Sequence, residues 1–295
     1  MTAPHPRLSI NQATVKYAPL AEALRVTADA GITSIGLWRD SVQAASLPAA
    51  ARLLADSGLR FSSLCRGGFF TVPEGHARRA AMDDNRKAIE EAAQLAASGA
   101  PGSAPVLVMV AGGLPQGSKD VAGARDMVQD ALAELVPEAQ AAGVTLALEP
   151  LHPMYASDRA VISTLKQALD LAAPFSPATV GVVVDTFHVW WDPELSAQIA
   201  RAGAEGRIAS YQVCDWATPL AADVLLSRHY PGDGVIDFAR ITAEVEAAGY
   251  AGDVEVEIFN QEIWDTAPAT AVARTVEGFE ATVAAHLGHG AEVRR

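Results

Sequence analysis

The chain alternates eight times between a short apolar run and a longer, alanine-rich amphipathic stretch, and this alternation strongly limits the possible folds. The apolar runs are rich in β-branched residues and show little polar–apolar alternation, which is typical of strands covered on both faces. We therefore expect strands over residues 8–11, 34–38, 60–65, 105–111, 144–149, 180–185, 208–214 and 254–259.

Helices are expected between these strands, and several of them end at a glycine just before the next strand. Eight strands alternating with eight helices predict a single (β/α)₈ TIM barrel that extends over residues 1–295. A doubly wound open sheet is the alternative, but it usually has a glycine-rich phosphate loop after its first strand, and this chain has none there. The expected helices span residues 20–30, 47–58, 76–99, 118–143, 159–173, 193–203, 238–249 and 267–287.

The charge balance narrows the range of partners. With 22 basic and 35 acidic residues the net charge is −13, which argues against nucleic acid and against anionic membrane surfaces. No apolar run is long enough to span a bilayer, and we expect no signal peptide. The two cysteines form no CxxC motif. These features predict a cytoplasmic protein with a small-molecule partner.

Acidic and amide side chains lie at the ends of four consecutive predicted strands. They are Glu149, Asp185, Gln212 and Glu257. Active sites of such barrels lie at the carboxyl ends of the strands, where these groups would meet and repel one another without a cation. Their oxygen atoms suit Mn²⁺ or Mg²⁺ better than Zn²⁺. Glu255 shares a strand face with Glu257 and is expected to point into the barrel below the metal.

Several segments resemble a known family. LALEPLHP, GVVVDTFHVWWDP, SYQVCDW, PGDGVIDF and GYAGDVEVEIF are similar to the sugar phosphate isomerase/epimerase-like family of xylose isomerase-like TIM barrels, including its branch of C-glycoside deglycosidase catalytic subunits. The resemblance implies one divalent metal held by Glu149, Asp185, Gln212 and Glu257. Many members have His where this chain has Gln212, so the identity of the metal stays open.

The resemblance also implies catalytic roles. In the family's epimerases the glutamates of strands 5 and 8 serve both as metal ligands and as acid and base, which here are Glu149 and Glu257. His188 matches a position that contacts substrate, so it is a candidate for orientation or proton transfer, as is His152. Arg228 matches a basic residue that holds substrate oxygens.

The tryptophans give a separate indication, because all five follow predicted strands. Trp38, Trp191 and Trp216 are therefore candidates for the walls of a site for a sugar ring or an aromatic aglycone. Arg228 is the one basic residue that we find for substrate binding in the loops after predicted strands 7 and 8. A phosphate site would need several, so the substrate is expected to be unphosphorylated.

The leading hypothesis is a metal-dependent isomerase or epimerase that abstracts a proton next to the carbonyl of an unphosphorylated sugar or keto-sugar. The first alternative is a lyase, dehydratase or deglycosidase that uses the same enolate on a 3-keto-glycoside. The sequence is compatible with a small partner subunit or with a homo-oligomer. The second is a non-catalytic sugar-binding barrel. An endonuclease for abasic DNA would need a histidine-rich zinc cluster and a basic groove, which the sequence lacks.

Overall fold

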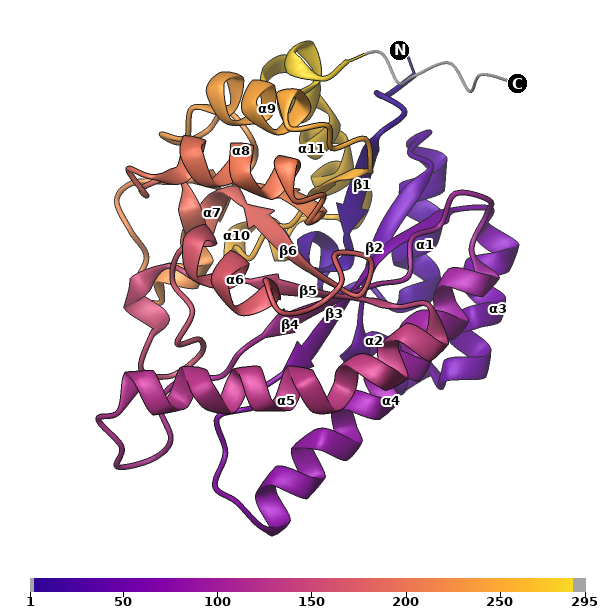
Figure 1. Cartoon of the computed structure of the whole chain (residues 1–295). Helices are drawn as coiled ribbons and strands as arrows, with labels where there is room; N and C mark the ends of the chain where they lie inside the picture. Colours follow the sequence, from indigo (N-terminus) through magenta and orange to yellow (C-terminus); the bar gives the residue numbers. More distant parts are fainter. Residues whose placement is uncertain (1–2, 289–295) are drawn as a thin grey trace.

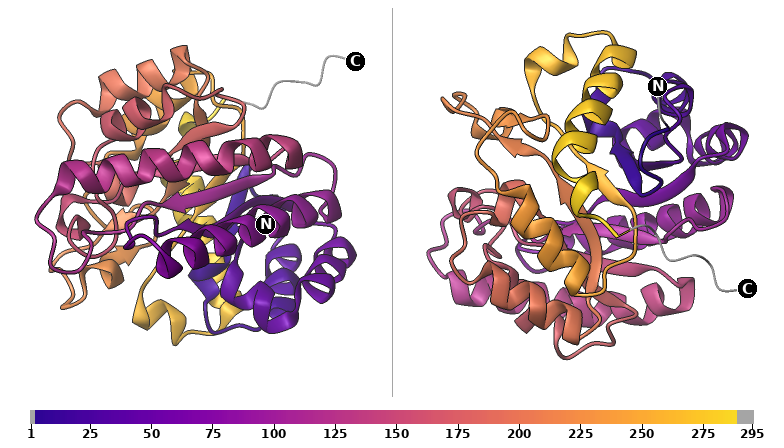
Figure 2. Two further views of the ribbon diagram at one scale, coloured as in Figure 1. Left: turned by 60° about the horizontal axis from the view of Figure 1, so that its bottom comes forward. Right: turned by 90° about the horizontal axis from the view of Figure 1, so that it is seen from above.

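The computed structural model describes residues 3–288 and shows a closed barrel of eight parallel strands surrounded by helices (Figures 1 and 2). Around the barrel the strands follow the order β1-β10-β7-β6-β5-β4-β3-β2. This confirms the predicted fold class. Residues 1–2 and 289–295 of the predicted domain lie outside the described residues. The barrel strands are β1 (Leu8–Asn11), β2 (Ser34–Trp38), β3 (Arg60–Gly68), β4 (Val106–Val110), β5 (Thr145–Glu149), β6 (Val180–Asp185), β7 (Ile208–Val213) and β10 (Val254–Val256).

The strands form a barrel because side chains on both of their faces find apolar partners. Ile10, Leu37, Leu148 and Val182 are fully buried within one continuous core. Parallel pairing runs unbroken from β1 through β10 back to β2. The carboxyl ends of all eight strands consequently open at one end of the barrel.

The helices lie outside the strands, and neighbours along the chain pack side by side, as α4 and α5 do in Figure 1. Within residues 3–288, no helix is long and apolar enough to cross a membrane. The helices are α1 (Leu20–Asp29), α2 (Arg39–Ala45), α3 (Leu47–Ser57), α4 (His76–Ser98), α5 (Val121–Ala142), α6 (Leu165–Ala172), α7 (Thr186–Val189), α8 (Leu195–Ala204), α9 (Phe238–Ala247), α10 (Gln261–Trp264) and α11 (Pro268–Thr282).

One predicted helix begins later than expected. The stretch 159–173 was expected to be helical throughout, but α6 starts at Leu165 because the Thr164 side chain caps it, accepting a hydrogen bond from the Gln167 backbone N–H at 3.2 Å. Before the cap, Ala160 forms a β-bridge with Gly112. Arg159 therefore lies in the loop that follows β5, at the mouth of the barrel.

The segment after β7 contains an antiparallel ribbon that the sequence pattern did not indicate. It pairs β8 (Asp215–Trp216) with β9 (Arg228–His229). The Asp215 carboxylate organises the turn that follows, because it accepts hydrogen bonds from the backbone N–H groups of Gly232, Gly234 and Ile236 at 2.8 to 3.0 Å. The ribbon brings Arg228 back over the end of the barrel.

Candidate metal centre and substrate cavity

The carboxyl ends of the strands open into a cavity of about 630 Å³. Its walls combine carboxylates, cations and aromatic rings, which is the mixture expected of a site for a polar ring-shaped ligand. Side chains that line it include Lys16, Trp38, Asp40, Cys65, Arg66, Phe69, Glu149, Arg159, His188, Asp223, Arg228, Glu257, Phe259 and Trp264.

The predicted metal ligands come from four neighbouring strands and lie together. Glu149 ends β5, Asp185 ends β6, Gln212 lies on β7, and Glu257 directly follows β10. All four are buried. Burial and the neighbouring carboxylates raise the pKa of Glu149 well above its usual range. Burial also raises the pKa of Glu257 to about 7, and Asp185 adds to this effect against the opposing charge of Arg228.

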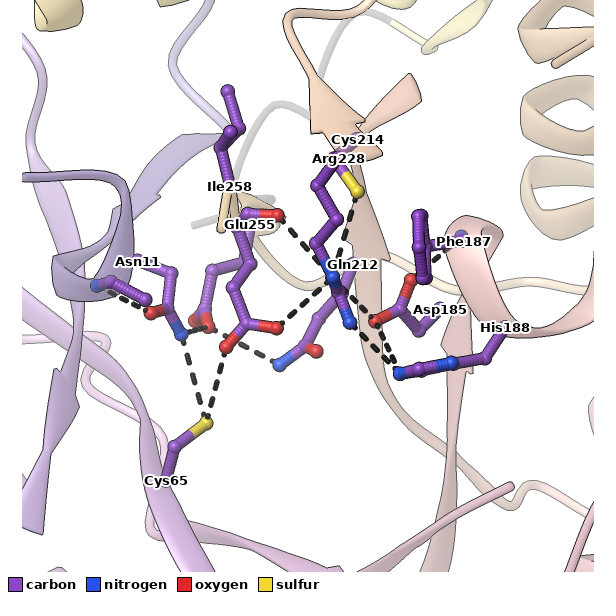
Figure 3. A network of polar contacts seen from close by, with 12 residues as sticks. Asn11, Cys65, Asp185, Phe187, His188, Gln212, Cys214, Arg228, Glu255 and Ile258 are labelled. Carbon is purple, nitrogen blue, oxygen red and sulfur yellow. Dashed lines mark hydrogen bonds and ion pairs between the residues drawn. The ribbon is translucent and has the colours of Figure 1, made fainter. Parts of the chain in front are cut away.

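Arg228 lies at the centre of this cluster (Figure 3). Its Nη1 is 3.0 Å from an oxygen of Asp185 and 3.1 Å from an oxygen of Glu257. With Glu149, Asp185 and Glu257 all ionised, the single guanidinium would leave a charge of −2 in a buried space, and the raised pKa values of the two glutamates reflect that cost. A divalent cation would neutralise that excess.

His188 is held between Arg228 and the backbone after β5. Its Nε2 lies 2.8 Å from Arg228 Nη2, and its Nδ1 lies 3.2 Å from the backbone nitrogen of His152. Arginine only donates hydrogen bonds, so His188 Nε2 accepts, and the neutral ring then carries its hydrogen on Nδ1 and cannot also accept from the His152 backbone N–H. Burial and the charge of Arg228 lower the pKa of His188 well below its ordinary value, which keeps the imidazole neutral.

Glu255 lies in the barrel interior, as the alternation rule predicts, and its carboxylate is surrounded by hydrogen-bond donors. It accepts hydrogen bonds from Asn11 Nδ2 at 2.6 Å, Ser63 Oγ at 2.9 Å and Gln212 Nε2 at 3.2 Å, and Ser62 donates a further one. A carboxylate needs donors, so the amide of Gln212 must turn its nitrogen toward Glu255. Gln212 Oε1 is left without a partner among the described residues.

These observations fit a divalent metal ion. The buried cluster would carry excess negative charge if its carboxylates were ionised, and Gln212, which pairs with Asp185 in the strand register, has an amide oxygen without a partner among the described residues. Glu149, Asp185 and His188 also offer ligand atoms that lie within 4.8 Å of one another. His188, which sequence reasoning assigned to substrate contact, is thus a further candidate ligand.

The predicted substrate-binding residues divide into two groups. Trp38 and Arg228 line the cavity. His152, Trp191 and Trp216 are not among its lining residues and pack on one another, with the His152 ring 5.4 Å from Trp191 and 5.2 Å from Trp216. Their contact with substrate stays a prediction.

This aromatic cluster packs against the Arg228 guanidinium through Phe187. Trp216 packs on the Phe187 ring at 4.7 Å, and the Arg228 guanidinium lies 4.6 Å from the centre of that same ring. Phe187 thereby adds a cation–π contact to the ion pairs of Arg228. The cluster therefore helps to hold the guanidinium among the carboxylates.

Sequence reasoning missed several residues of the cavity, above all Lys16, Arg66 and Arg159. They follow or end strands β1, β3 and β5, whereas basic residues were sought after strands 7 and 8. Arg66 escaped notice because strand 3 was expected to end at Cys65, but β3 continues to Gly68. A search of every predicted strand end would have found Arg66, whereas Arg159 was expected to begin a helix.

Comparison with known proteins gives relatives that are named as epimerases and relatives that are named as dehydratases. The chain is 35% identical over 145 residues to a 3-dehydroshikimate dehydratase of Pseudomonas aeruginosa, matching 48% of this chain and 22% of that protein. It is 30% identical over 171 residues to an L-ribulose 3-epimerase of Mesorhizobium japonicum, matching 56% of this chain and 53% of that protein. The chain thus spans about a fifth and about half of these two relatives.

Solved structures share the whole fold. A protein of Sinorhizobium meliloti 1021 is 47% identical, with a TM-score of 0.89, and the match covers 94% of this chain and 98% of that one. The zinc-binding IOLI protein is 20% identical with a TM-score of 0.79, covering 96% and 99% of the two chains. The family described as xylose isomerase-like TIM barrel matches residues 24–282, and with the observed barrel this establishes that the chain belongs to the xylose isomerase-like TIM barrel family.

Proposed function

We propose that this protein is a divalent-metal-dependent isomerase or epimerase that moves a proton next to the carbonyl of an unphosphorylated sugar or keto-sugar. The observation that carries the proposal is the pair of buried carboxylates, Glu149 and Glu257, at the cavity. They come from strands separated by two others in the barrel, β6 and β7. Two such groups can address one carbon of a bound ring from different sides.

The protonation of these groups suits proton transfer. The pKa of Glu257 is about 7 in the metal-free protein, and a bound metal would favour its ionised form, which is the form that accepts a proton. One glutamate removes the proton from the carbon next to the carbonyl, and the other returns a proton to the opposite face. The relatives named as an epimerase and a dehydratase are consistent with chemistry of this kind.

Glu149, Asp185, Gln212 and Glu257 would hold the metal, which when bound polarises the substrate carbonyl and stabilises negative charge on its oxygen. Their all-oxygen donor set favours Mn²⁺ or Mg²⁺. Arg228 keeps Asp185 and Glu257 in place through its two ion pairs. Arg228 also holds His188 through a hydrogen bond. We assign Arg228 and His188 to orienting the substrate.

A second function, elimination from a 3-keto-glycoside, is favoured by the size of the cavity. About 630 Å³ with aromatic walls leaves room for a group attached to the sugar. After the same proton abstraction, the electron pair of the C–H bond would form a C=C bond. The bond to the neighbouring group would break, and that group would leave with a proton.

The test is proton exchange followed by NMR in D₂O. Protein loaded with Mn²⁺ or Mg²⁺ is offered ketoses and 3-keto-glycosides, beside metal-stripped protein and Glu257→Gln. Metal-dependent deuterium incorporation with a new isomer supports the isomerase, and incorporation with a released group supports the lyase. If the loaded protein exchanges no proton in either class of compound, the proposed reaction is wrong.

A further inference from the structure

The cavity is lined by basic side chains that the proposed proton transfer does not use. They are Lys16, Arg66 and Arg159, and two acids that this chemistry does not use either, Asp40 and Asp223, line the same cavity. The chain as a whole has a net charge of −13. These basic side chains therefore stand out against the acidic balance of the whole chain.

Arg66 is the most informative of these side chains because its guanidinium has no anionic partner within residues 3–288. Among the described residues it forms no side-chain hydrogen bond or ion pair, and its guanidinium carbon lies 4.1 Å from the centre of the Phe69 ring. It is only partly exposed, and burial lowers its pKa from the ordinary value. The charges of Asp40 and Glu149 act on it from beyond ion-pair distance. A partly buried arginine normally satisfies its donors, so these donors are available to a ligand.

The backbone is strained at Phe69, the residue whose ring contacts the Arg66 guanidinium. Phe69 has a φ of +56°, in the left-handed region that is unfavourable for a residue with a Cβ. Hydrogen bonds from Phe69 N–H to the Val110 carbonyl at 2.7 Å and from Phe70 N–H to the Ala111 carbonyl at 2.9 Å hold it there. Strain of this kind persists mainly at functional sites.

Arg159 adds a second available cation. Its guanidinium lies over the Tyr155 ring at 5.3 Å, and its nearest acid, Asp158, is at the 3.9 Å limit of an ion pair. Its charge acts on both Arg66 and His188. Two like charges facing one partly enclosed cavity repel each other, and an anion bound between them removes that cost.

We propose that Arg66 and Arg159 form a subsite for a carboxylate group of the substrate, so that this enzyme acts on a sugar acid or a related cyclic keto acid rather than on a neutral sugar. A planar carboxylate matches the guanidinium fork. A phosphate dianion would call for more donors, such as backbone N–H groups at a helix start. The assignment rests on the proposed function for the position of the sugar ring and adds the group that selects the substrate.

The test compares D-glucuronate with D-glucose, which differ only in the carboxylate at C6. Dissociation constants are measured by ligand-observed NMR for wild type, Arg66→Gln and Arg159→Gln, with and without Mn²⁺. Arg79→Gln is the matched control, because Arg79 is an exposed arginine of α4 that does not line the cavity. Wild type and the control should prefer the acid by about tenfold, the value of one charge-assisted pair. Arg66→Gln should lose the preference, and Arg66→Lys should keep part of it.

Several results would overturn the proposal. One is equal binding of the two sugars, or no binding of the acid, by wild type. Another is a preference that appears only with Mn²⁺ and survives in Arg66→Gln, which would mean that the metal itself holds the carboxylate. A third is a preference for glucose 6-phosphate alone that depends on Arg66, which would assign the subsite to phosphate. None of these measurements needs turnover, so an absence of deuterium exchange would refute the proposed reaction and leave the binding result standing.

Discussion

Removing the metal should make the stability of this protein fall as the pH rises, because Glu257 is buried among other carboxylates. The folded state keeps a proton on Glu257 up to about pH 7, whereas the unfolded chain releases it near the ordinary value of 4.5. Between these values the folded state binds more protons than the unfolded state, so the free energy of unfolding decreases with pH. One pH unit is worth about 1.4 kcal/mol, and the gap therefore costs about 3 kcal/mol by about pH 8. The raised pKa of Glu149 acts in the same direction.

Urea unfolding followed by tryptophan fluorescence measures this effect, with EDTA present, at steps from about pH 4.5 to about pH 8. The control is Glu257→Gln, which keeps the shape of the side chain but cannot titrate. Over this range the free energy of unfolding should fall by about 3 kcal/mol more in wild type than in the variant. Saturating Mn²⁺ should remove the difference, because metal binding favours the ionised form. Identical pH slopes for metal-free wild type and Glu257→Gln would refute the reasoning.

Three further substitutions test other parts of the structure. Glu255→Gln replaces the carboxylate that holds the amide of Gln212. Calorimetry should show Mn²⁺ binding weakened by about tenfold. Unchanged affinity would show that Glu255 does not orient this ligand. Gly68→Ala places a Cβ against the Val110 carbonyl at a φ of +109°; it should lower the free energy of unfolding by more than about 2 kcal/mol, and a neutral urea midpoint would contradict this. Asp215→Ala removes the acceptor of several loop N–H groups. It should lower the free energy of unfolding by about 2 kcal/mol and increase proteolysis between residues 216 and 236. A digestion rate equal to that of wild type would disprove this.

The barrel could be predicted from the sequence because its signal is local and repeated. Three of the eight strands, β1, β2 and β6, have the predicted bounds, since each is a continuous buried run ended by a polar or aromatic residue. The helix expected over residues 159–173 was misjudged at its start. Its first residues have adequate helix propensity, but the tertiary β-bridge at Ala160 and the cap at Thr164 decide the outcome.

The candidate metal residues could be predicted because parallel strands bring their carboxyl ends together whatever the loops do. The position of Arg228 among the carboxylates could not, since it depends on a ribbon with only two residues in each strand. The free guanidinium of Arg66 could not be predicted either. Whether an arginine is paired is a property of packing, and the positive φ of Phe69 that places its ring leaves no sequence signature in a non-glycine residue.

The central claim is that one divalent ion binds at the ends of β5, β6, β7 and β10, and Mn²⁺ titration of metal-stripped protein tests it most directly. Calorimetry should give one site per chain, and Asp185→Asn should weaken it by more than about tenfold. Asp83→Asn, which alters an exposed aspartate of α4, should bind like wild type. Absence of a site in wild type, or equal affinity in wild type and Asp185→Asn, would contradict the account.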